Sequence, residues 1–112
     1  MIALVEQAHG EAIAMLAPGV ACREVALRVD EIFARASLSM PHGLGHGIGL
    51  DAHEAPAIRS REDCAEVLSP GQVVTIEPGL YLPELGGARL EDDILITETG
   101  SEVLTKSRIV RL

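Results

Sequence analysis

HGLGHGIGLDAHEAP, the segment from His42 to Pro56, places three of the chain's four histidines among closely spaced glycines. Glycine is favoured where the backbone adopts a positive φ or passes close to another group. In an extended segment alternate residues share a face, so His42 and His46 are expected to point the same way. A glycine-rich loop with incidental histidines is the alternative, but three histidines together favour one catalytic or metal-binding site.

The composition around this segment indicates one small domain. The chain has 112 residues, of which 47% are hydrophobic, a length and composition that allow a single core. Its only aromatic residues are Phe33 and Tyr81, so Ala, Val, Leu and Ile must fill that core. The formal charge of −8 argues against a nucleic-acid or anionic-membrane partner, because both attract an excess of Lys and Arg, and it fits cation binding.

The cysteines and the N-terminal residues bear on the compartment. Cys22 and Cys64 are far apart in sequence and lack the spacing of a zinc knuckle or a redox pair, so we expect two reduced thiols. The first residues lack a basic start and a long apolar run, and no stretch approaches the roughly 20 apolar residues of a membrane span. These features predict a cytoplasmic protein with neither signal peptide nor membrane anchor.

The first third of the chain predicts a helical hairpin over residues 2–36. A first helix over 2–16 has apolar residues at helical spacing and stops at Pro18-Gly19. No Ser, Thr, Asp or Asn precedes it as a cap, which suggests a chain cut from something longer. A second helix over 21–36 carries one apolar stripe made of Cys22, Val25, Val29, Ile32 or Phe33, and Ala36. A short turn between two such helices makes them antiparallel neighbours.

The rest of the chain predicts antiparallel strands. After a solvated loop over 59–65, the β-branched run 73–77 reads as a strand, and 80–83 as an extended segment followed by a reversal at Gly86-Gly87. Residues 89–97 and 102–105 are expected to be two strands joined by a hairpin turn over 98–101. Two helices followed by antiparallel strands define an α+β fold.

Acidic residues interrupt two of these strands. Glu77 ends the first, and Glu91 begins a run of three carboxylates in the second, although Glu and Asp are depleted in strands. An edge position or solvent exposure would explain them singly. Together with His46 they form a nitrogen and oxygen donor set that suits Mn, Fe, Co or Zn better than Ca. His42 and His53 would then be free to donate hydrogen bonds to a developing oxyanion.

Three motifs in this order resemble a known family: HGLGHGIGLDAHEAP (42–56), VVTIEPGLYLP (73–83) and GARLEDDILITETGSEVLT (87–105). They are similar to the C-terminal part of metallopeptidase family M24, the pita-bread fold of methionine aminopeptidase, aminopeptidase P and prolidase. LAPGVACREV (16–25) also resembles that family. Two features, the RLEDD form of the last motif and His42 before Gly-Leu-Gly-His, resemble the proline peptidases more than methionine aminopeptidase. The resemblance implies the C-terminal half of a pita-bread fold, with the helical hairpin at 2–36 and a metal-site sheet at 42–112.

The resemblance also implies roles for single residues. His46, Glu77 and Glu91 would be metal ligands, with Glu77 also a proton shuttle and Glu91 a bridge between two divalent ions, Mn, Co, Zn or Fe. His42 and His53 would line the substrate site and stabilise the tetrahedral intermediate, with Arg89 supporting the site. The implied reaction is hydrolysis of the peptide bond after an N-terminal residue, often before proline, so the implied partner is a peptide.

Two aspartates of the family's metal site come from an N-terminal half that these 112 residues do not contain, since Asp30 is the only Asp before His42. We therefore expect a fragment, a truncated gene product or one chain of a two-chain enzyme, inactive by itself. Formation of a homodimer, or association with the missing half, would complete the metal site. The alternatives are a non-catalytic pita-bread binding module, a methionine aminopeptidase-type enzyme and an acidic domain with chance motifs.

Overall fold

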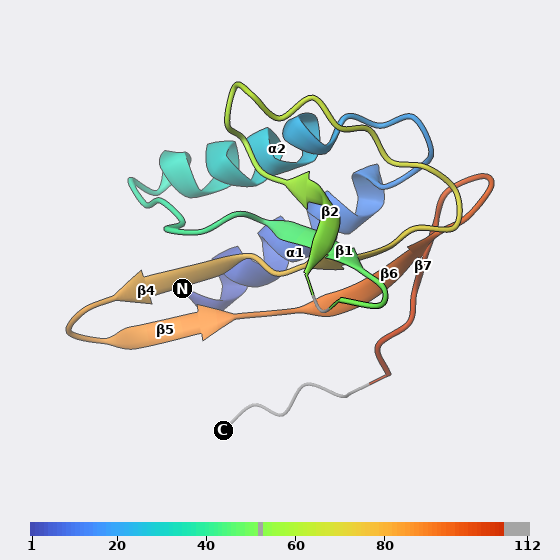
Figure 1. Cartoon of the computed structure of the whole chain (residues 1–112). Helices are drawn as coiled ribbons and strands as arrows, with labels where there is room; N and C mark the ends of the chain where they lie inside the picture. Colours follow the sequence, from blue (N-terminus) through green and yellow to red (C-terminus); the bar gives the residue numbers. More distant parts are fainter. Residues whose placement is uncertain (52, 107–112) are drawn as a thin grey trace.

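The fold was obtained as a computed structural model, which describes residues 1–51 and 53–106. These residues form two helices and seven strands (Figure 1). The helices are α1 (Ile2–Met15) and α2 (Cys22–Arg35). The strands are β1 (Gly45–Ile48), β2 (Glu54–Ile58), β3 (Val73–Ile76), β4 (Gly79–Leu82), β5 (Gly86–Arg89), β6 (Asp92–Ile96) and β7 (Ser101–Val103). The α+β class with antiparallel strands is confirmed, while the predicted sheet region at 107–112 lies outside the described residues.

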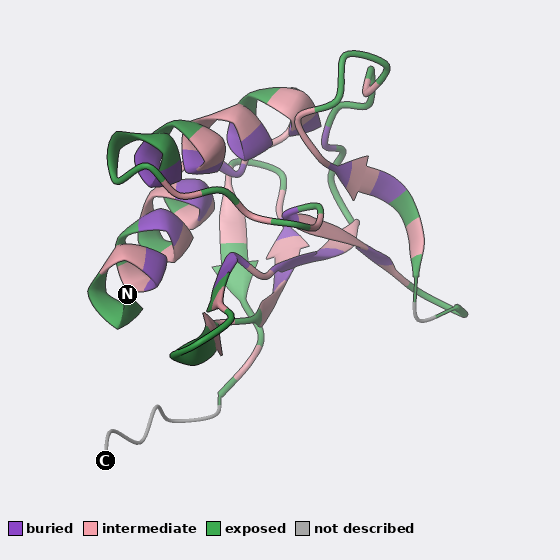
Figure 2. Ribbon diagram, turned by 90° about the vertical axis from the view of Figure 1, so that its left-hand side faces the viewer, coloured by how far each residue is buried: buried purple, intermediate pink, exposed green. Residues whose placement is uncertain are grey.

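Five strands make one antiparallel sheet in the order β2-β1-β3-β6-β7, and β4 and β5 make a separate two-stranded sheet. Both helices lie together on one side of the larger sheet (Figure 2). The order places β3 at the centre, between the histidine-bearing β1 and the acidic β6. Residues 16 to 27 positions apart in sequence are thereby paired across β3, which is how the three motifs come together.

The core fills the space between the helices and the sheet with aliphatic side chains. The helices contribute Val25, Val29 and Phe33 among others, each fully buried, and the central strands contribute Ile76 and Ile94. Each such side chain stabilises the fold by roughly 1.5–3 kcal/mol on burial. The buried set is Val5, Ala8, Ala12, Leu16, Cys22, Val25, Ala26, Val29, Ile32, Phe33, Leu44, Ile58, Leu68, Val74, Ile76, Leu80, Ile94 and Ile96. Among the described residues, no helix has the length and apolar character needed to cross a membrane.

The predicted helical hairpin agrees closely with the structure. Both helices end within one residue of the expected C-termini. The N-cap of α1 is Met1, which makes no side-chain cap hydrogen bond, as the sequence indicates. The predicted stripe of α2 is buried except for Ala36, which lies beyond the last helical residue and is exposed. The hairpin is fastened by an ion pair between Arg28 of α2 and Glu11 of α1.

Two expectations about the strands are wrong. Residues 89–97 do not form one strand, because β5 ends at Arg89 and β6 begins at Asp92, in a different sheet. The Leu90 N–H donates to Pro78 O at 3.2 Å, in the register that pairs β4 with β5, and Pro78 has no N–H with which to continue the ladder. The reversal lies at Pro83 to Leu85 rather than at Gly86-Gly87, both of which belong to β5.

The glycines of the histidine segment allow strands to approach closely. A Cβ on Gly45 would lie 1.8 Å from Thr75 O of β3, and one on Gly47 would lie 2.2 Å from Ala55 O of β2. No side chain fits at such distances, so these positions require glycine. The pairing of β1 with β2 also shifts register between His46 and Gly47, a bulge that bends the strand where the histidine sits.

Candidate active site

A cavity of about 420 Å³ opens on the strands that carry the three motifs. Five of the six residues expected at the site line it: His46, His53, Glu77, Arg89 and Glu91. Ile48, Thr75 and Asp93 complete its wall. The structure thus brings five of the expected residues to one cavity, although His46 and Glu91 are 45 positions apart in sequence.

The register of β3 and β6 brings the two glutamates together. Ile76 pairs with Asp92 at the end of this antiparallel ladder, so Glu77 and Glu91 are the next residues on either strand. Alternate residues project to opposite faces, which turns Ile76 into the core and Glu77 toward the cavity. Thr75 and Asp93 form the preceding pair of the ladder and line the same cavity.

Two hydrogen bonds position His46. Its backbone N–H donates to Thr75 Oγ1 at 3.1 Å, and the ring Nδ1 lies 3.0 Å from the backbone oxygen of Gly47. A carbonyl oxygen only accepts, so Nδ1 carries the hydrogen and Nε2 of the neutral ring presents a lone pair. This is the arrangement in which an outer hydrogen bond prepares a histidine for metal binding. His46 Nε2 points toward Glu77, with 3.7 Å between Nε2 and Oε2.

His53 lies against His46, with ring centroids 4.1 Å apart and planes tilted by 34°. It comes from the turn between β1 and β2 and is exposed at the rim of the cavity. Arg89 closes the opposite side, at the end of β5. The pKa of Glu91 is raised overall by stronger influences, and the nearby guanidinium of Arg89 opposes this rise.

Those stronger influences are burial, followed by the charge of Glu77, and together they raise the pKa of Glu91 above its ordinary value. Two carboxylates that share one site repel each other unless a proton or a cation lies between them. The donor set, one imidazole lone pair and two carboxylates, therefore fits a divalent cation in kind. In the described residues, however, no three His, Cys, Asp or Glu side chains already stand close enough to hold an ion.

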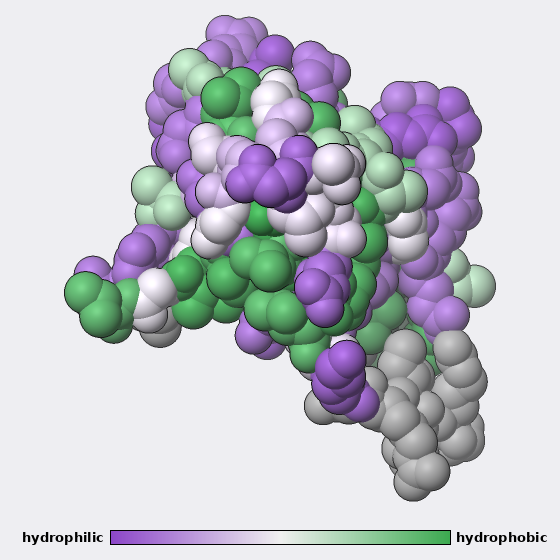
Figure 3. Space-filling view, turned by 90° about the vertical axis from the view of Figure 1, so that its right-hand side faces the viewer, coloured by the Kyte–Doolittle hydropathy of each residue, from purple (hydrophilic) through white to green (hydrophobic). Residues whose placement is uncertain are grey.

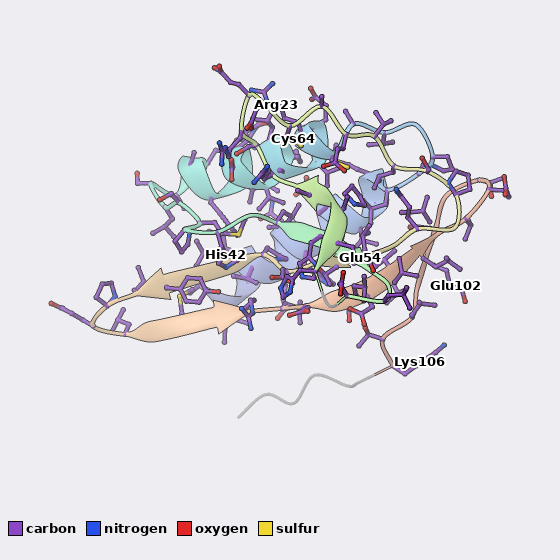
Figure 4. All side chains as sticks on the ribbon, viewed as in Figure 1. Arg23, His42, Glu54, Cys64, Glu102 and Lys106 are labelled. Carbon is purple, nitrogen blue, oxygen red and sulfur yellow. The ribbon has the colours of Figure 1, made fainter. Side chains whose placement is uncertain are left out.

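His42 is not part of this cavity, contrary to the expectation that it points the same way as His46. It precedes β1, outside the strand whose alternation would have aligned it, and lines a different cavity. Its Nδ1 lies 2.8 Å from Gly43 O and its Nε2 lies 2.8 Å from Tyr81 Oη. In Figure 4 His42 lies toward the β4–β5 hairpin, while Glu54 lies on the β1–β2 side.

Tyr81 contacts His42 and, like the cavity residues Ile48, Thr75 and Asp93, was not among the site residues expected from the sequence. Its ring lies across two glycines of its own hairpin: a Cβ on Gly79 would be 2.5 Å from Tyr81 Oη, and one on Gly87 would be 2.5 Å from Cδ1. The tyrosine hydroxyl thereby reaches His42, and the two rings meet edge-on with centroids 5.5 Å apart. The available signal was that a chain with only two aromatic residues has one of them inside the second motif.

A histidine and two glutamates around one cavity of an antiparallel sheet, with a second histidine at its rim, are the donor chemistry of a metallohydrolase. The metallopeptidase family M24 model matches residues 1–98. The chain therefore belongs to metallopeptidase family M24.

Solved structures agree with this assignment. A prolidase from Pyrococcus horikoshii is 40% identical, with a TM-score of 0.89 over 95% of this chain and 30% of its own. A prolidase from Pyrococcus furiosus is also 40% identical, with a TM-score of 0.89 over 96% of this chain and 32% of its own. The fold is thus part of the pita-bread fold.

Curated relatives give the same result. An Xaa-Pro dipeptidase of Pyrococcus horikoshii is 41% identical over 106 residues, 93% of this chain and 30% of the relative. An uncharacterized peptidase of Bacillus subtilis is 42% identical over 106 residues, again 93% of this chain and 30% of the relative. The chain thus spans about 30% of the length of the curated relatives it matches.

Proposed function

We propose that residues 1–112 supply the C-terminal half of the active site of a metal-dependent exopeptidase of the Xaa-Pro dipeptidase or aminopeptidase type. The substrate is a peptide cleaved after its N-terminal residue, often before proline. One observation carries the proposal: the imidazole of His46 and the carboxylates of Glu77 and Glu91 line one cavity. The similarity to Xaa-Pro dipeptidases and prolidases supports the substrate class.

In this proposal His46, Glu77 and Glu91 hold a pair of divalent cations, Mn, Co, Zn or Fe. Such ions lower the pKa of water and stabilise negative charge that develops on a carbonyl oxygen. Glu77 has the contacts for this role, since it touches both His46 and Glu91. A cation held here would relieve the repulsion between the carboxylates of Glu91 and Glu77.

The protein's own groups move the protons and hold the substrate. The Glu77 carboxylate accepts the proton of the attacking water and returns it to the departing nitrogen, as general base and then general acid. His53, exposed at the rim, donates a hydrogen bond to the substrate carbonyl oxygen. Arg89 balances the negative charge beside Glu91. His42, held by Tyr81, contacts the substrate on the side of the β4–β5 hairpin.

The site needs two further carboxylates from outside these residues, supplied by an N-terminal half or by a second copy of the chain in a homodimer. Exposed apolar side chains favour association, among them Leu50, Val103 and Leu104. Figure 3 shows hydrophobic surface in the middle of one face of the molecule. The isolated chain is accordingly proposed to bind metal weakly and to be inactive by itself.

Cys22 and Cys64 are both free thiols, which supports a cytoplasmic location.

A non-catalytic binding module on the same fold is the second candidate. It is favoured by the absence, among residues 1–51 and 53–106, of three donors already within reach of one ion. The two candidates differ in whether the protein with a complete ligand set hydrolyses peptides. Hydrolysis of an Xaa-Pro dipeptide with added Mn²⁺ or Co²⁺, by this chain joined to an aspartate-bearing N-terminal half, distinguishes them.

Calorimetric titration with Mn²⁺ tests the half-site directly. We expect one weak class of binding to the chain alone, lost in His46→Ala and Glu77→Gln. The matched control is Glu102→Gln, which removes an exposed carboxylate on β7. Two tight sites on the chain alone, or binding unaffected by either site variant, contradict the proposal. Sedimentation tests the homodimer, and a clean monomer at high concentration excludes it.

A further inference from the structure

A second cavity, of about 310 Å³, lies between α2, the segment before β1 and the loop after β2. It shares no lining residue with the cavity of His46 and Glu77. Its wall combines apolar and charged side chains. The lining residues are Ala26, Asp30, Met40, Pro41, His42, Gly43, Leu44, Arg59, Ser60 and Arg61.

Two of these residues carry opposite charges that the described part of the chain leaves unpaired. Arg59 forms no ion pair or side-chain hydrogen bond there, and its Nε is buried without a partner. Asp30, on α2, likewise has no ion pair or side-chain hydrogen bond within residues 1–51 and 53–106. Both side chains are only partly exposed, and they do not approach each other within the 4.0 Å of an ion pair. A partly buried charge without a partner is unfavourable, so each requires a counter-charge.

The neighbouring arginines are already engaged. Arg23 Nε donates to Ser60 O at 3.1 Å, which ties the loop after β2 to α2. Arg61 pairs with Asp63, with 3.2 Å between Nη2 and Oδ2. Arg59 Cβ lies beside Gly43, 3.6 Å from the position that a Cβ on that glycine would take. Figure 4 shows Arg23 and Cys64 on the loop side of α2. Of the two arginines that line the cavity, Arg59 is the one whose charge has no partner among the described residues.

We propose that this cavity binds a free α-amino acid as a zwitterion. Its carboxylate pairs with the guanidinium of Arg59, and its ammonium pairs with the carboxylate of Asp30. The apolar wall formed by Met40, Pro41 and Leu44 receives an aliphatic side chain. The volume is at the small end of ligand pockets, which favours a single amino acid over a larger molecule. The proposal does not rest on the proposed peptidase function: its two charged contacts, Arg59 and Asp30, take no part in that function, although His42, proposed above to contact the peptide, also lines this cavity.

The test uses calorimetry with L-leucine as probe, in buffer containing EDTA so that the metal centre plays no part. N-acetyl-L-leucine lacks the ammonium and L-leucinamide lacks the carboxylate. Each is expected to bind at least about 10-fold more weakly than leucine, since each loses one charge-assisted contact. The dipeptide Gly-Pro distinguishes a free amino acid from a peptide ligand, and it should also bind more weakly.

Variants assign the two contacts. Arg59→Gln and Asp30→Asn should each lower the affinity for leucine by about 10-fold or more. Arg59→Gln should leave the residual binding of leucinamide unchanged, and Asp30→Asn should leave that of N-acetyl-leucine unchanged. The matched controls are Arg35→Gln and Asp51→Asn, which alter charges outside the cavity and should bind leucine like the parent. Circular dichroism confirms that every variant is folded.

Three results overturn the proposal. The first is no saturable leucine binding by the parent chain at millimolar concentration. The second is leucine binding that neither Arg59→Gln nor Asp30→Asn changes. The third is tighter binding of Gly-Pro than of leucine, which would make the cavity a peptide site.

Discussion

The hydroxyl of Tyr81 and the imidazole of His42 are joined by a contact of 2.8 Å between Oη and Nε2, across 39 residues of sequence. His42 Nδ1 faces a carbonyl oxygen and therefore carries the ring hydrogen, so Nε2 accepts from the tyrosine. The contact fixes both the tautomer and the orientation of a histidine proposed to bind substrate. It depends on Gly79, whose missing side chain leaves room for the two groups.

Gly79→Ala should separate this pair. Its Cβ would lie 2.5 Å from Tyr81 Oη and 3.2 Å from His42 Nε2, so one ring must move. Tyr81→Phe removes only the hydroxyl and should cost about 0.5 kcal/mol of unfolding free energy, because the side chain is 43% exposed. Gly79→Ala should cost more. Urea denaturation gives both values, and the ¹⁵N shifts of His42 report its tautomer.

The control for this comparison is Gly100→Ala, where an added Cβ meets nothing within 4 Å. It should leave the His42 signals unchanged. Unchanged His42 signals in Gly79→Ala would show that the pair does not form in solution.

Gly45→Ala should be among the most damaging single changes in the chain. The added Cβ would stand 1.8 Å from Thr75 O, which forces β1 and β3 apart and disturbs the backbone of His46. We expect a loss of about 3 kcal/mol or more in unfolding free energy. Gly10→Ala is the opposite case, because the added Cβ meets no atom within 4 Å inside α1. It should raise stability by roughly 0.5–1 kcal/mol. Equal effects of the two changes on the urea midpoint would contradict this account.

The helices were predictable because their signals are local. The apolar spacing of α1 and α2 and the Pro18-Gly19 stop act within a few residues of each other. The break at Leu90 was not predicted, since Leu90 lies opposite Pro78, a residue of another motif that has no N–H to continue the ladder. Gly87 looked like a turn residue, yet it is glycine because the ring of Tyr81 lies on it. Tertiary contacts decided both positions.

The candidate site divides in the same way. Glu77 and Glu91 were grouped from the sequence as carboxylates out of place in strands, and alternation along the paired β3 and β6 turns both toward one cavity. The same argument failed for His42, since β1 begins only at Gly45 and alternation has no meaning before a strand begins. The unpaired charges of Asp30 and Arg59 had no sequence signal, because only the packing of α2 against the loop after β2 brings them to one cavity.

Glu91→Gln should stabilise the metal-free chain at pH 7 while weakening its response to metal. Burial and the charge of Glu77 raise the pKa of Glu91, so its ionised form is disfavoured in the folded protein. Removing the charge should gain a few tenths of a kcal/mol, a small value because the residue is exposed to solvent. Added Mn²⁺ should raise the urea midpoint of the parent more than that of the variant. Glu102→Gln should behave like the parent, and a variant less stable than the parent without metal would refute the repulsion.

Cys22 should make the folded state less stable at alkaline pH. Its thiol is fully buried, and burial raises its pKa from 9.0 to about 11, because an ionised sulfur is poorly solvated there. Between these two values the folded protein retains a proton that the unfolded chain releases. Stability is therefore complete below pH 9 and falls as the pH rises toward 11, by on the order of 2 kcal/mol. Urea denaturation from pH 7 to 11 measures the fall. Cys22→Ala removes this contribution, so its stability should decline less steeply. Parallel declines in parent and variant would show that the thiol ionises equally in both states.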